Sequence, residues 1–143
     1  MTSDGKPLDE ALLREVARRL GSLTLIDTVR VFPQQKPASV VATFDSVYYP
    51  DEIRRVELEL RAYQNDDFNV IYREVRSGED WMARWDRHDN PHNSRDHYHR
   101  PPRARTEDAV DNAYPTDLFD VVEEILAEID SRLGEVWDHT EEE

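Results

Sequence analysis

Cysteine is absent from the 143 residues of this chain. Disulfide bridges and thiolate metal ligands are therefore excluded. No run of apolar residues approaches the ~20 that a membrane-spanning helix needs, and the N-terminal stretch lacks the apolar centre of a signal peptide. We therefore expect a cytoplasmic protein that does not enter a membrane.

Lysine is almost as scarce. The only lysines are Lys6 and Lys36, so nearly all of the 18 basic residues are arginines, and 32 acidic residues bring the formal net charge to −14. Excess carboxylate with little lysine is typical of proteins adapted to a salty cytoplasm, because the Debye length falls to ~3 Å at 1 M salt and self-repulsion weakens. We interpret the composition as halophile-type. The negative charge also argues against non-specific coating of DNA.

Glycine is rare too, with four residues, so the chain is not a low-complexity linker. The length is typical of a single domain, which we assign to residues 1–143. Apolar residues at helical spacing predict an N-terminal helix at about 8–20 and a C-terminal helix at about 117–133. An irregular loop rich in histidine, arginine and proline occupies residues 89–105.

Between the first helix and this loop, residues 23–88 show the two-residue alternation of strands. Five segments carry it, at about 23–32, 39–49, 53–63, 68–75 and 81–88. Consecutive strands joined by short turns pair in antiparallel fashion. The sequence therefore predicts an α+β fold, a mostly antiparallel five-stranded sheet with the N- and C-terminal helices packed on one face.

The histidines are concentrated in one segment. Four of the five lie within twelve residues, at His88, His92, His97 and His99. Six arginines and three aspartates lie between positions 84 and 105, so this segment has a formal charge of +3 within an acidic chain. Alternation along the last predicted strand directs Arg84, Asp86 and His88 to one face and the tryptophans to the other.

In the first interpretation, the segment is the active site of a metal-independent ribonuclease without a cofactor. Imidazole titrates near neutrality and serves as a general acid or base, while arginine binds phosphate in a bidentate manner. The candidate catalytic residues are His88, His92, His97, His99 and Asp86. The candidate substrate-binding residues are Arg84, Arg87 and Arg100.

Two other interpretations stay open. In one, the segment binds zinc or another transition metal, with His92, His97 and His99 as candidate ligands and His88 and Asp86 as further donors. In the other, the chain is a non-enzymatic module, and its open sheet face or this segment docks a protein partner.

The order of residues in this segment resembles the signature of the TumE-type toxins of toxin–antitoxin pairs. Arg84-Trp85-Asp86 is followed by Pro91-His92 and then by His97-x-His99. Four residues separate Asp86 from Pro91, and Asn93 stands where the family often has a second histidine. The resemblance implies a growth-inhibiting toxin that is held by a cognate antitoxin protein, with RNA as a plausible substrate. Whether the chain forms a homodimer stays open.

Overall fold

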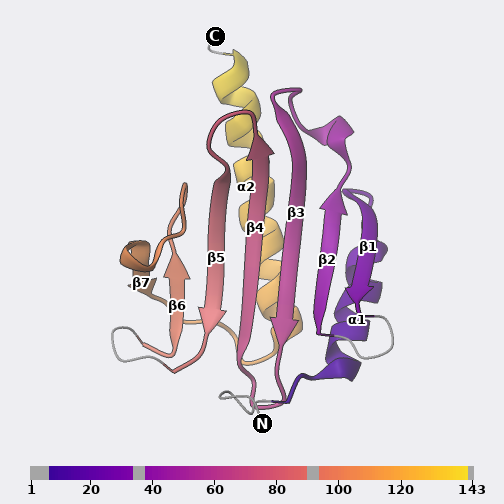
Figure 1. Cartoon of the computed structure of the whole chain (residues 1–143), viewed down its shortest axis with the longest axis vertical. Helices are drawn as coiled ribbons and strands as arrows, with labels where there is room; N and C mark the ends of the chain where they lie inside the picture. The colour runs from indigo at the N-terminus through magenta and orange to yellow at the C-terminus, as the bar shows by residue number, and fades with distance from the viewer. Residues whose placement is uncertain (1–6, 34–37, 90–93, 142–143) are drawn as a thin grey trace.

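The computed structural model of the chain describes residues 7–33, 38–89 and 94–141. Within these residues, seven strands form one antiparallel sheet in which each strand pairs with the next one along the sequence (Figure 1). The strands are β1 (Ile26–Phe32), β2 (Ser39–Phe44), β3 (Ile53–Ala62), β4 (Phe68–Arg76), β5 (Trp81–Arg87), β6 (Asp96–His99) and β7 (Ala109–Asp111). The helices are α1 (Glu10–Gly21) and α2 (Leu118–Glu141), with short 3-10 turns η1 (Ser46–Tyr48) and η2 (Thr106–Asp108).

Each helix is preceded by an aspartate that caps its first turn. The side chain of Asp9 accepts a hydrogen bond from the backbone N–H of Leu12 at 3.1 Å, and Asp117 accepts one from Phe119 at 2.8 Å. These carboxylates satisfy N–H groups that have no partner within the helix. In Figure 1 both helices lie behind the sheet, α1 behind β1 and α2 behind β4.

A buried ion pair joins α2 to the sheet. Glu74 of β4 is fully buried, and its two carboxylate oxygens accept hydrogen bonds from Arg132 of α2 at 2.8 and 2.9 Å. The guanidinium of Arg132 also lies 3.8 Å from the ring centre of Trp81 on β5.

Among the described residues, neither helix is long and apolar enough to cross a membrane.

The α+β class and the antiparallel pairing agree with the sequence prediction, but the prediction of five strands was wrong. β6 and β7 are the additional strands, and β6 lies inside the stretch that we expected to be an irregular loop. The β6 segment, Asp-His-Tyr-His, has only four residues and is too polar to give a strand signal. It becomes a strand because β5 provides hydrogen-bonding partners on one side and β7 on the other.

The C-terminal helix is also longer than predicted, since it continues to Glu141 rather than ending near residue 133. Val136 is buried in its last turns, and the indole N–H of Trp137 donates to the backbone carbonyl of Tyr48 at 2.8 Å. These contacts hold the part of the helix that lies beyond residue 133.

Candidate functional site

Strand β5 presents two chemically different faces. Ala83 and Trp85 are buried on the face that α2 covers, and the indole N–H of Trp85 donates to Glu128 of α2 at 3.2 Å. Because strand side chains alternate, Arg84 and Asp86 lie on the opposite face. His88 follows the strand and lies on that face as well, with Nε2 3.7 Å from Oδ2 of Asp86. The structure thus has the arrangement that the alternation predicts for these three residues.

The register between β5 and β6 adds two histidines to this face. His97 pairs with Asp86, and His99 pairs with Arg84. Residues that pair across an antiparallel ladder have their side chains on the same face. Two neighbouring strands therefore bring Arg84, Asp86, His88, His97 and His99 together, and we call these five residues the Asp86 cluster.

The carboxylate of Asp86 is the centre of the cluster. Its Oδ2 atom lies 3.2 Å from Nε2 of His99 and 3.5 Å from Nε2 of His97, in addition to His88. The guanidinium of Arg84 donates through Nε to the same oxygen at 3.0 Å, and its Nη2 lies 2.9 Å from Nε2 of His99. Arginine can only donate, so Nε2 of His99 accepts this hydrogen bond.

Backbone carbonyls orient all three imidazole rings of the cluster. Nδ1 of His88 lies 3.1 Å from the carbonyl oxygen of Asp89, and Nδ1 of His97 lies 3.3 Å from that of Ser94. Nδ1 of His99 lies 3.0 Å from the carbonyl oxygen of Arg105. A carbonyl only accepts hydrogen bonds, so each Nδ1 carries a proton, and the Nε2 atom of each neutral ring, which lies near Asp86, carries the lone pair.

Part of the cluster is accessible and part is buried. The side chains of Asp86, His97 and His99 are 3–4% exposed, whereas those of Arg84 and His88 are 33% and 39% exposed. Burial lowers the pKa of His97 below its ordinary 6.5 and outweighs the nearby charge of Asp86, which acts in the opposite direction. A ligand from solution therefore meets Arg84 and His88 first, with a neutral His97 behind them.

Two arginines that the sequence suggested for substrate binding lie apart from the cluster. Arg87 is buried on the opposite face, where it donates to Asp96 at 2.7 and 3.2 Å and to the carbonyl oxygens of Tyr114 and Pro115. These bonds hold the end of β5 to β6 and to the segment before α2. Arg100 is exposed, and its Nε donates to the carbonyl oxygen of Asp108 at 3.0 Å. The fourth predicted histidine, His92, lies outside the described residues.

Sequence reasoning did not identify the groups that hold the rings in place. They are the carbonyl oxygens of Asp89, Ser94 and Arg105, together with Asp111, whose carboxylate accepts the backbone N–H of Ser94 at 2.8 Å. Backbone carbonyls have no side-chain signature, so no residue pattern could have revealed them. Asp111 belongs to β7, a strand that the sequence pattern did not predict.

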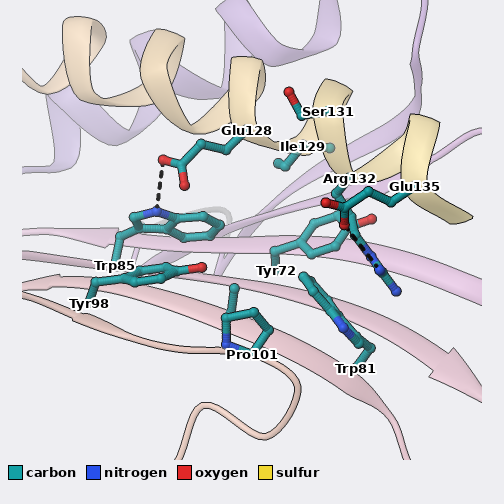
Figure 2. Close-up of a pocket in the computed structure, with 11 residues that line it drawn as sticks. Tyr72, Trp81, Trp85, Tyr98, Pro101, Glu128, Ile129, Ser131, Arg132 and Glu135 are labelled. Carbon is teal, nitrogen blue, oxygen red and sulfur yellow. Dashed lines mark hydrogen bonds and ion pairs between the residues drawn. The ribbon is translucent and has the colours of Figure 1, made fainter. Parts of the chain in front are cut away.

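A pocket of about 270 Å³ lies on the other face, between the sheet and α2 (Figure 2). Figure 2 shows the rings of Trp85 and Tyr98 along the sheet side and Glu128 and Arg132 along the helix side. Burial raises the pKa of Glu128, although the hydrogen bond from Trp85 acts in the opposite direction. Trp85 and Asp86 point to opposite faces of β5, so this pocket is separate from the Asp86 cluster.

The family model for the toxin TumE matches residues 12–133. This match covers most of the chain and contains all five residues of the Asp86 cluster. The chain therefore belongs to the TumE toxin family, which confirms the resemblance found in the sequence. No curated protein and no solved structure matches the chain.

Proposed function

We propose that this protein is the toxin of a toxin–antitoxin pair and that it cleaves RNA at the Asp86 cluster, without a metal. The observation that carries the proposal is the convergence of three imidazoles and one arginine on a single buried carboxylate. Imidazole and guanidinium groups are those that acid–base cleavage of a phosphodiester needs. Membership of a toxin family supports growth inhibition as the biological outcome.

The accessible edge of the cluster fits the two tasks of this reaction. Arg84 binds the non-bridging phosphate oxygens and stabilises the negative charge that develops on them. His88 takes the proton from the attacking 2′-hydroxyl group through Nε2. The bond from the 2′-oxygen to phosphorus forms while the bond from phosphorus to the 5′-oxygen breaks. His88 then passes the proton that it has taken to the departing 5′-oxygen. Asp86, His97 and His99 position these two groups.

The test is cleavage of an end-labelled RNA by purified protein in the presence of a chelator. We expect fragments that end in a 2′,3′-cyclic phosphate and no cleavage of the same oligonucleotide with 2′-deoxyribose. His88→Gln should lower the rate by about 100-fold or more, which is the usual contribution of a general acid–base group. Arg84→Gln should also lose about 100-fold.

A matched control is available for the arginine. Arg103 is exposed and pairs with Glu79 at 2.7 Å, away from the cluster. Arg103→Gln removes the same charge and should cleave at the wild-type rate. Equal losses in Arg84→Gln and Arg103→Gln would mean that general charge, rather than the Asp86 cluster, carries the activity, and the proposal would be wrong.

The alternative function is a binding module that docks a protein without turnover. It predicts intact RNA in every assay and a stable complex with a partner protein. The proposal includes a partner too, the cognate antitoxin, so complex formation alone does not separate the two functions. Growth inhibition separates the two functions, because His88→Gln should abolish growth inhibition by the proposed toxin while the complex with the antitoxin still forms.

A further inference from the structure

Three members of the Asp86 cluster have the chemistry and spacing of metal ligands. Asp86, His88 and His97 each offer one ligand atom, and these atoms lie within 4.8 Å of one another. Oδ2 of Asp86 is 3.7 Å from Nε2 of His88 and 3.5 Å from Nε2 of His97. Ligands at 2.0–2.1 Å in a tetrahedral zinc site are about 3.3 Å apart. Shifts of a few tenths of an ångström therefore suffice to close these two distances around an ion.

The rings of His88 and His97 are held in the orientation that metal ligation requires. Histidines that bind metals donate their second ring N–H to a carbonyl or a carboxylate, and this fixes both the tautomer and the ring plane. Nδ1 of His88 has the carbonyl oxygen of Asp89 as its partner, and Nδ1 of His97 has that of Ser94. The Nε2 atoms, which lie near Asp86, thereby carry the lone pairs.

This arrangement brings hydrogen-bond acceptors close to one another. The carboxylate of Asp86 and the Nε2 atoms of neutral His88 and His97 all carry lone pairs and no proton. Oδ1 of Asp86 is buried and has no hydrogen-bond partner among the described residues. A buried carboxylate oxygen without a donor is costly. A cation between these three groups would place a positive charge next to this buried carboxylate and next to both Nε2 atoms.

The arginine already in the cluster does not satisfy the whole carboxylate of Asp86. Arg84 donates to Oδ2 and to His99, and Oδ1 has no donor among the described residues. His99 is a poor ligand, since its Nε2 accepts the hydrogen bond from Arg84.

We infer that Asp86, His88 and His97 form a binding site for one divalent transition-metal ion of the zinc type. Two imidazoles and one carboxylate suit zinc and its neighbours better than calcium or magnesium, which prefer oxygen ligands. The binding site stands on this geometry alone. Its consequence for activity rests on the proposed function: the ion occupies Nε2 of His88, so zinc should suppress the cleavage that this imidazole performs.

Binding is tested by titrating zinc into chelator-treated wild-type protein and measuring heat and bound metal per chain. We expect one zinc ion per chain. His88→Gln removes a ligand, so it should weaken binding by more than the roughly 10–100-fold that changing a group beside a ligand costs. His99→Gln is the matched control: His99 contacts Asp86 but is not a ligand, so this variant should still bind one ion and lose about 10-fold in affinity. His88 lies at the exposed edge of the cluster, so its variant keeps the test valid even where a change at buried His97 prevents folding.

Two outcomes would overturn the inference. One is the absence of a stoichiometric site. The other is a set of weak sites that His88→Gln leaves unchanged, as expected for zinc on the acidic surface. RNA cleavage measured on the same samples separates this inference from the proposed function. Cleavage without zinc binding refutes the metal site alone, and zinc binding that raises cleavage refutes the metal-independent reaction alone.

Discussion

Replacing Arg132 with methionine should destabilise the protein strongly, because it leaves the buried carboxylate of Glu74 without its principal cation. Arg132 provides two of the hydrogen bonds to Glu74, while Arg76 and Tyr72 provide one each, at 2.7 and 2.9 Å. Removing one partner of a buried ion pair typically costs about 3–5 kcal/mol. Since Arg76 and Tyr72 remain, we expect a loss near the lower end, about 3 kcal/mol.

Methionine is chosen because it keeps an unbranched stem near Trp81, so the loss of charge is separated from the loss of packing. The assay is urea unfolding followed by tryptophan fluorescence. Arg18→Met is the control, because Arg18 is exposed and pairs with Glu15 on the surface. This control should change the free energy of unfolding by at most about 0.5 kcal/mol. A double variant with methionine at both Glu74 and Arg132 should recover part of the stability, because no buried carboxylate is left without its cation, although Arg76 and Tyr72 lose an acceptor.

The pH dependence provides a second readout of the same pair. Burial by itself would raise the pKa of Glu74, but hydrogen bonds from Arg132 and Arg76 outweigh it and hold the pKa below the ordinary 4.5. Glu74 therefore stabilises the fold above about pH 4.5, and this contribution is lost as the pH falls through the lowered folded pKa. Glu74→Gln should show less acid destabilisation in that range.

In the urea experiment, a loss of unfolding free energy below about 1 kcal/mol in Arg132→Met would show that Arg132 is not the principal cation of Glu74.

Three further predictions concern stability. Arg87→Ala should cost about 3 kcal/mol in urea unfolding and speed hydrogen exchange in β6, because buried Arg87 pairs with the partly buried Asp96; unchanged exchange in β6 would contradict this role. Glu128→Gln should match or exceed wild-type stability at neutral pH, because burial raises the pKa of Glu128 and disfavours its charged form, and the difference should shrink as the pH falls through the raised pKa and vanish below the ordinary 4.5 of the unfolded chain. Raising potassium chloride from about 0.1 M to about 1 M should raise the melting temperature, because it screens the net charge of −14; a fall would contradict the halophile interpretation.

The part of the fold that local patterns determine could be predicted from the sequence. The apolar stripes of the two helices and the alternation in β1 to β5 depend on burial of one face, so they leave a periodic signal. β6 and β7 leave none, because they are short and polar and form by pairing with a neighbour.

The Asp86 cluster could be predicted in part for the same reason. Alternation within one strand places Arg84, Asp86 and His88 together. The position of His97 opposite Asp86 depends on the register between two strands, which no local pattern specifies. Arg87 shows the limit of composition as a guide. Its charge suggested phosphate binding, while its place on the tryptophan face of β5 gives it the bonds to Asp96 and to two carbonyl oxygens.

The most direct test of the account is RNA cleavage by wild-type protein and His88→Gln, side by side, in the presence of a chelator. We expect the wild type to produce fragments with cyclic phosphate ends. His88→Gln, with an unchanged circular dichroism spectrum, should be slower by about 100-fold or more. Intact RNA with the wild type, or equal rates for the two proteins, would contradict the claim that the Asp86 cluster is the active site.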